Sequence, residues 1–151
     1  MLEAVEEASH KVLIFVPFTH TIKQVHDYLN KHGISNDVIN GEVPVARRNK
    51  IVNDFQEKEN PRVLVIQPQA ASHGLTLTQA DTIVWYAPVS SVEIYLQANA
   101  RIDRPGQKHN MTVVHIKSSP IEARLYDLLR SNINNHEKII ELYKQELAED
   151  T

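Results

Sequence analysis

The chain has 151 residues, 42% of them hydrophobic and 23% charged, which is enough for one domain with a buried core. It contains no cysteine, so disulfides and thiolate zinc sites are excluded, which is consistent with a reducing compartment. The formal net charge of -3 argues against a strongly basic nucleic-acid binder, and no apolar run is long enough to cross a bilayer.

The charge is nevertheless unevenly distributed along the chain. Residues 97–117 carry four basic side chains against one acidic, whereas residues 141–151 carry four acidic side chains against one basic. A basic middle and an acidic tail allow local contact with phosphate within a mildly acidic domain.

Short β-rich runs alternate with helix-period runs along most of the chain. The runs are continuously apolar, which is typical of strands covered on both faces, as in a parallel sheet. The predicted strands are residues 12–16, 37–40, 63–67, 82–86 and 111–116.

The predicted helices lie between and after these strands. Thr21 and Gln24 have the spacing of a capping box at the start of the first helix, and Gly33 is placed to end it. A second helix begins at Pro44 and stops before Pro61, and a third runs over about residues 91–103. A fourth helix begins at residues 119–122 and a fifth covers about residues 137–146. The side chains that these helices turn inward are Ile22, Val25 and Leu29, then Ile51, Val52 and Phe55, then Leu125, Leu128 and Leu129, and last Ile139, Ile140 and Tyr143.

This alternation of strands and helices predicts an α/β fold with a mostly parallel sheet flanked by helices. In such sheets, ligands collect at the loops that follow the carboxyl ends of the strands. We expect residues 1–10 to be a connector or frayed terminus, residues 11–134 to be the domain, and residues 135–151 to be a C-terminal helix with an acidic tail.

The most informative run is residues 97–107, which reads Gln-Ala-Asn-Ala-Arg-Ile-Asp-Arg-Pro-Gly-Gln. Gln97, Arg101 and Arg104 are four and then three residues apart, which predicts one stripe on a helix. Pro105 and Gly106 predict that this helix ends at once, leaving Arg104 on an exposed lip. Two guanidiniums there suit the charge that develops on a nucleotide phosphate, although arginines on a solvated helix face are the alternative.

The order of motifs resembles the second RecA-like lobe of superfamily-two helicases, and most closely the Swi/Snf-type DNA-dependent ATPases, over about residues 11–132. Motif six of that family reads Gln-x-x-x-Arg-x-x-Arg-x-Gly-Gln, and residues 97, 101, 104, 106 and 107 match it. Gln97-Ala98 stands where RNA helicases of the DEAD-box type usually have a His-Arg pair. Motif five is matched by residues 74–77 and 80–81, with Ala71-Ser72 in place of a glycine pair and Thr76 in place of asparagine.

The resemblance implies a three-layer, RecA-like (P-loop NTPase-type) domain that works with an N-terminal RecA-like lobe and double-stranded DNA. Arg101 and Arg104 would be arginine fingers that reach ATP, bound with Mg mainly by that first lobe. Gln97 would lie near them, and Gly74 would lie at the lobe interface. The residues that would touch the DNA backbone are Thr19, Asn40, Gly41, Ser72 and His73. A cytoplasmic location is implied, nucleoid-associated or phage-encoded, or a nuclear one in a eukaryote.

The chain carries no complete set of ATP-hydrolysing residues. No glycine precedes a lysine, so no phosphate-binding loop can be drawn, and there is no Asp-Glu pair for magnesium. We therefore expect half of an active site, inactive alone, in a fragment or a subunit. A non-catalytic RecA-like binding or regulatory module, an RNA helicase lobe and a restriction-type translocase lobe are the alternatives.

Several of these residues also have simpler interpretations. Thr19 can merely end a strand, Gly41 can merely make a turn, and residues 72–73 can form a helix-cap loop. Trp85 is expected in the core, and residues 47–48 on a solvated helix face. The eight histidines show no metal-ligand spacing.

Overall fold

A computed structural model describes residues 1–71, 74–131, 139, 142 and 144–146. Five parallel strands form one sheet in the order β2-β3-β1-β4-β5. Each predicted strand is confirmed to within two residues at either end. The strands are β1 (Lys11–Phe15), β2 (Asn36–Ile39), β3 (Val63–Ile66), β4 (Ala80–Trp85) and β5 (Thr112–His115).

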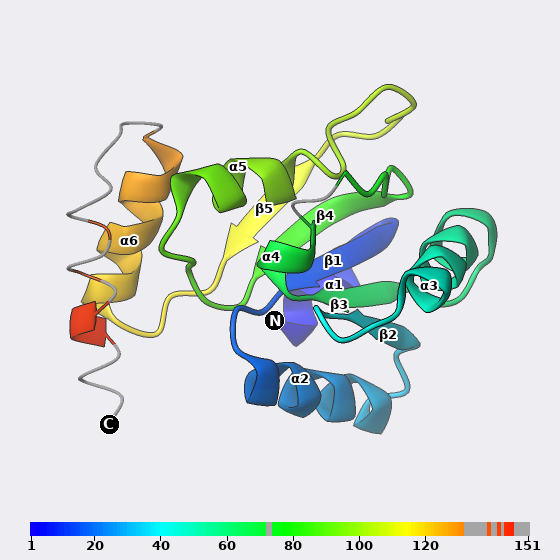
Figure 1. The fold of residues 1–151 in the computed structure, drawn as a ribbon, viewed down its shortest axis with the longest axis horizontal. Helices are drawn as coiled ribbons and strands as arrows, with labels where there is room; N and C mark the ends of the chain where they lie inside the picture. Colours follow the sequence, from blue (N-terminus) through cyan, green and yellow to red (C-terminus); the bar gives the residue numbers. More distant parts are fainter. Residues whose placement is uncertain (72–73, 132–138, 140–141, 143, 147–151) are drawn as a thin grey trace.

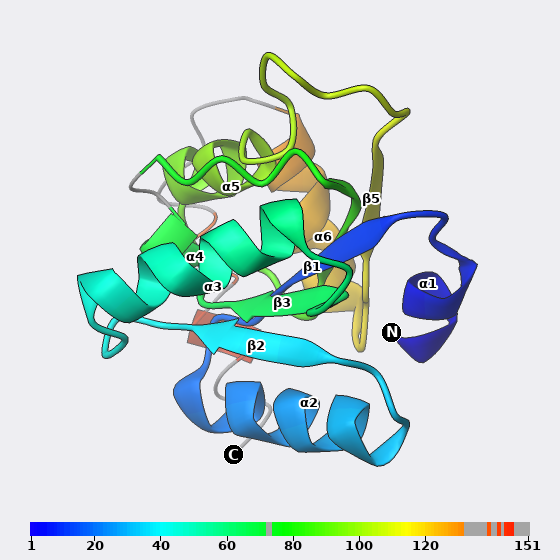
Figure 2. The same cartoon turned by 90° about the vertical axis from the view of Figure 1, so that its right-hand side faces the viewer.

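Helices cover both faces of this sheet and give the molecule three layers (Figures 1 and 2). One face is covered by α1 and α2, and the other by α3, α4, α5 and α6. The predicted α/β fold is therefore confirmed. The helices are α1 (Leu2–Glu7), α2 (Thr19–Lys31), α3 (Val45–Glu57), α4 (Pro68–Ala71), α5 (Val92–Asn99) and α6 (Pro120–Arg130).

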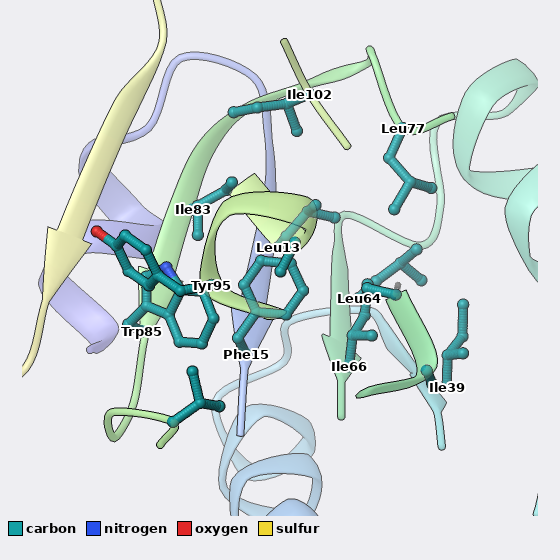
Figure 3. Close-up of a cluster of buried hydrophobic side chains, with 14 of the residues drawn as sticks. Leu13, Phe15, Ile39, Leu64, Ile66, Leu77, Ile83, Trp85, Tyr95 and Ile102 are labelled. Carbon is teal, nitrogen blue, oxygen red and sulfur yellow. The ribbon is translucent and has the colours of Figure 1, made fainter. Parts of the chain in front are cut away.

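Alternation along the strands divides the core between these two faces. Leu13 and Phe15 of β1 pack with the α3–α6 layer, whereas Val12 and Ile14 pack with α1 and α2. This follows from the strand geometry, in which successive side chains point to opposite faces. Figure 3 shows the larger cluster, in which Trp85 of β4 lies beside Phe15 and below the ring of Tyr95.

The amino-terminal ten residues differ from the expected connector. They include α1, whose Val5 is fully buried against β1 and α2. The Arg62 guanidinium holds the end of α1, because its Nη2 donates to the carbonyls of Val5 at 2.7 Å and Ala8 at 3.2 Å. The last carbonyl groups of a helix have no hydrogen-bond partner within it, so the charged side chain of Arg62, which directly precedes β3, supplies the missing donors.

Three further local expectations need correction or restriction. The capping box at Thr21 was wrong, because α2 begins at Thr19 with Phe18 as its N-cap and no side-chain cap bond. The strand β5 is partly exposed, with Val113 40% exposed, because it is an edge strand. Of the expected helix at 137–146, the described residues 139, 142 and 144–146 are helical, and Ile140 and Tyr143 lie outside the described residues.

None of the helices in the described part of the chain has the length and apolar character of a membrane span.

A chain of polar and aromatic contacts joins β4, β5, α5 and α6 inside the larger cluster. The Tyr95 hydroxyl lies 2.7 Å from His115 Nε2, and the Tyr126 hydroxyl donates to the carbonyl of Trp85 at 3.2 Å. The rings of His115 and Tyr126 have centroids 4.5 Å apart. Burial, with smaller contributions from Arg130 and Lys117, lowers the pKa of His115 from 6.5 to about 4.

This lowered pKa predicts a loss of stability in mild acid. The unfolded chain binds a proton at His115 near pH 6.5, whereas the folded chain binds it only near pH 4. The contribution of His115 is therefore complete above pH 6.5 and is lost as the pH falls toward 4. We expect about 1–2 kcal/mol after discounting for its partial exposure. Urea unfolding at pH 7.5 and at pH 4.5 would measure it.

The matched comparison is His115→Gln, which removes the titrating group and keeps polar atoms in its place. Every other ionisable side chain is common to both proteins, so the difference between the two pH profiles isolates His115. An equal loss of unfolding free energy in both proteins would contradict the assignment.

Candidate functional site

The end of α5 sets the position of the two motif-six arginines. Ser91 caps its start, accepting from the Ile94 amide at 3.2 Å, and the helix ends at Asn99 rather than at Asp103 as predicted. Two tertiary contacts explain the early end. The carbonyl of Arg101 accepts from the Leu77 amide at 3.1 Å, and Ile102 is only 1% exposed within the core.

Gln97, Arg101 and Arg104 therefore do not share a helical stripe. Gln97 lies in α5 and its side-chain amide donates to Glu93 at 3.2 Å. Arg101 lies beyond the helix, and its Nε donates to the carbonyl of Gln97 at 2.8 Å. The structure thus brings Gln97 to Arg101 through its main chain and directs its side chain to another residue.

The two arginines converge on the segment that leads into β4. Arg101 Nη1 lies 3.5 Å from the carbonyl oxygen of Leu75, and Arg104 Nη1 lies 3.4 Å from the same oxygen. Both distances exceed the usual 2.9–3.0 Å, so this carbonyl engages each guanidinium loosely. Gly74 precedes it at φ +85, and a Cβ there would lie 3.8 Å from Arg101 Nη1. The glycine is needed for its backbone conformation, and not to make room for the arginine.

The arginines differ in exposure. Arg101 is 8% exposed, so the expected exposed lip was wrong for this residue, whereas Arg104 is partly exposed. Burial, and then the charge of Arg104, lowers the pKa of Arg101. Its guanidinium stays charged at neutral pH, because arginine side chains are not deprotonated in proteins.

The two cations lack acidic partners within the described part of the chain. No carboxylate of the described residues lies within 4.0 Å of either guanidinium. The four ion pairs among the described residues are all formed by other side chains. Each guanidinium has five N–H donors, and most of those on Arg104 have no partner among the described residues. Two neighbouring like charges with spare donors form a site that an anion would stabilise.

Of the predicted DNA-facing residues, Thr19, Asn40 and Gly41 lie at the edge of the sheet where the strands end. Thr19 and Gly41 are exposed and follow the carboxyl ends of β1 and β2. Asn40 Oδ1 accepts from the Glu42 amide at 2.9 Å, which makes a local turn. Arg101 and Arg104 instead lie in a turn beside Ala80, the first residue of β4. The helix before this turn, α5, runs from the carboxyl ends of the strands toward their amino ends (Figure 1). The expectation that ligands collect at the carboxyl ends of the strands therefore does not extend to the position of Arg101 and Arg104. Ser72 and His73 lie outside the described residues.

Two simpler interpretations are decided by burial. Trp85 is fully buried, as expected of a core residue. Arg47 is exposed on α3 as predicted, but Arg48 is partly buried and its Nε has no hydrogen-bond partner among the described residues. The solvated position was therefore wrong for Arg48.

Sequence reasoning missed the main-chain groups that organise the site. The carbonyl of Leu75 accepts from the arginine side chains, and the amide of Leu77 donates to the Arg101 carbonyl. No pattern of side chains in the sequence predicts such main-chain contacts. Sequence reasoning also assigned no role to Gln107, although the motif match included this residue. The described residues contain no group of three potential metal-ligating side chains.

Comparison with known proteins gives a family match over much of the chain. The family described as the helicase conserved C-terminal domain matches residues 1–106. That range includes the sheet strands β1 to β4, Gly74, Arg101 and Arg104.

Three curated relatives illustrate the sequence similarity. The chromatin-remodeling ATPase INO80 of Arabidopsis thaliana is 28% identical over 116 residues, which is 77% of this chain and 8% of that protein. The chromodomain-helicase-DNA-binding protein 1-like of Danio rerio is 29% identical over 142 residues, covering 93% of this chain and 14% of its own length. A SWI/SNF-related, matrix-associated, actin-dependent regulator of chromatin, subfamily A containing DEAD/H box 1 homolog, from Caenorhabditis elegans is 27% identical over 151 residues, covering 99% and 15%. The chain thus spans a small part of each relative.

A solved structure supports the fold. The C-terminal part of the Fun30 ATPase domain has a TM-score of 0.75 to this chain at 20% identity, covering 88% of this chain and 45% of that one. A likeness at this identity is one of fold, and it agrees with the RecA-like α/β architecture.

Proposed function

The chain belongs to the helicase conserved C-terminal domain family, in the form found in Swi/Snf-type ATPases, and from this premise we propose that it is the second motor lobe of an ATP-dependent DNA translocase. In this proposal a first RecA-like lobe binds ATP with Mg, and this chain supplies arginine side chains to the nucleotide and contacts the DNA backbone. The activity belongs to the two lobes together.

The observation that carries the proposal is the pair of guanidiniums at the Leu75 carbonyl. Arg101 and Arg104 repel each other, and no carboxylate of the described residues neutralises them. A polyphosphate would relieve that repulsion and accept the spare donors in bidentate pairs. The γ-phosphate of ATP held by a facing lobe has this chemistry.

The two arginines would have different tasks. Arg104 is partly exposed and weakly held, so it is free to reach the phosphate and to retreat after hydrolysis. Arg101 is buried and anchored on the Gln97 carbonyl, so it would raise the local positive potential from a fixed position. Gln97 would approach the nucleotide only after its side chain leaves Glu93.

The DNA contacts rest on the carboxyl edge of the sheet. Thr19 begins α2, whose N-terminus has no side-chain cap bond, so its amide groups suit a phosphate oxygen. Asn40 and the exposed Gly41 lie in the neighbouring loop. Ser72 and His73 stay predicted DNA contacts. Alternating closure of the lobes on ATP would change the hold on the backbone and move the motor along the duplex.

The test is ATP turnover by a protein that joins this chain to a first lobe, measured without nucleic acid, with duplex DNA and with RNA. We expect no turnover from this chain alone and stimulation of the two-lobe protein by duplex DNA above that by RNA. Stronger stimulation by RNA would favour the RNA helicase alternative. No turnover with any nucleic acid would favour the non-catalytic module.

A further inference from the structure

The segment that carries both arginines lies outside any helix or strand. We call residues 100–107 the arginine turn. The main-chain bonds that hold it include one from the Leu77 amide to the Arg101 carbonyl at 3.1 Å and one from the Gln107 amide to the Arg104 carbonyl at 3.0 Å. Main-chain bonds in an irregular segment hold side chains less firmly than a helix or strand does.

The side chain of Gln107 adds a further attachment. Its Nε2 donates to the carbonyl of Ile102 at 2.8 Å and to the carbonyl of Ala80 at 2.9 Å. Its Oε1 accepts from the amide of His109 at 3.1 Å. An amide nitrogen has two hydrogens, so both donors are used on main-chain carbonyls.

The positions of these two carbonyls give the bonds a consequence for the site. Ile102 lies between Arg101 and Arg104 in the chain, and its side chain is 1% exposed in the core. Ala80 is the first residue of β4, a strand with neighbours on both sides in the sheet. One side chain therefore ties the middle of the arginine turn directly to the sheet.

We propose that Gln107 is a positioning residue for Arg101 and Arg104, which fixes the arginine turn on β4 so that Arg104 meets the phosphate in a productive geometry with Arg101 held beside it. This inference rests on the proposed function of the arginines as ATP contacts. A displacement of about 1 Å in a positioned group costs up to about a hundredfold in rate. Loss of the tie should therefore lower kcat more than it changes KM.

The informative variant is Gln107→Met in the two-lobe protein. Methionine has similar length and no charge, so it removes all three side-chain bonds without adding a carboxylate beside the arginines. The matched control is Asn36→Leu, because Asn36 donates to Asn30 Oδ1 at 2.9 Å and to the Ile34 carbonyl at 3.0 Å, between α2 and β2. Both variants lose a side-chain amide that donates two hydrogen bonds, but only Gln107 lies on the arginine turn.

We expect Gln107→Met to lower kcat at saturating ATP tenfold or more, and Asn36→Leu to leave kcat within twofold at a temperature where both are folded. We also expect Arg104→Ala to cost less in the Gln107→Met background than in the wild type, since the misplaced arginine contributes less. If Gln107→Met does not fold, Gln107→Asn replaces it, because the shorter amide cannot reach both carbonyls.

The outcomes separate the inference from its premise. Wild-type kcat in the Gln107 variant, with Arg104→Ala inactive, would overturn the positioning role and leave the arginine assignment intact. Equal losses of kcat in the Gln107 and Asn36 variants would reduce Gln107 to a stabilising residue. Wild-type turnover in Arg104→Ala would overturn both proposals.

Discussion

Replacing Arg104 by alanine in the two-lobe protein is expected to lower DNA-stimulated ATP turnover about a thousandfold or more, which is the usual cost of removing an arginine finger. Arg104 is partly exposed and its contact with the Leu75 carbonyl is long, at 3.4 Å, so the side chain contributes little to the fold. Its loss should therefore act on the transition state. Steady-state turnover with saturating duplex DNA measures the effect.

The control for this experiment is Arg124→Ala, which removes an exposed arginine from α6. Both variants should keep the wild-type circular dichroism and Tm, and only Arg104→Ala should lose turnover. Binding of ATP should change little, because the first lobe holds most of the nucleotide in our proposal. Wild-type turnover in Arg104→Ala would show that this arginine does not contact the reacting phosphate.

Replacing Trp85 by alanine is expected to lower the free energy of unfolding by about 3–5 kcal/mol, the range for removing a large aromatic side chain from a core. Trp85 is fully buried on β4 and its ring centroid lies 4.8 Å from that of Phe15 and 5.0 Å from that of Tyr95 (Figure 3). Its Nε1 also donates to Asn99 at the end of α5 at 2.9 Å. The cavity would therefore loosen the helix that leads into the arginine turn.

Urea unfolding followed by circular dichroism would measure this loss, because the variant lacks the chain's one tryptophan and with it the natural fluorescent probe. Trp85→Phe is the matched variant, since it keeps most of the buried volume and loses the bond to Asn99. It should cost less than the alanine variant. Equal stability of Trp85→Ala and the wild type would contradict the buried position.

The motif spacing identified the residues of the candidate site better than it identified their local structure. Arg101, Arg104 and Gly74 were selected from the sequence, and the structure brings them together at the Leu75 carbonyl. The prediction that the helix continues to about Asp103 was wrong, because helical spacing takes no account of the bond from the Leu77 amide or of the burial of Ile102 in the core. Both partners are distant in sequence.

The strand–helix order and the parallel α/β layer could be predicted without coordinates, because apolar periodicity and helix-ending residues are local signals. The structure confirms the predicted elements in β1 to β5 and in α2, α3 and α6. The motif-six spacing of the two arginines could likewise be identified without coordinates. The burial of Arg101, the partial exposure of Arg104 and the bond from Gln107 to β4 became evident only from the folded arrangement. These features depend on main-chain carbonyls and amides, which every residue carries, so their roles follow from where the chain places them.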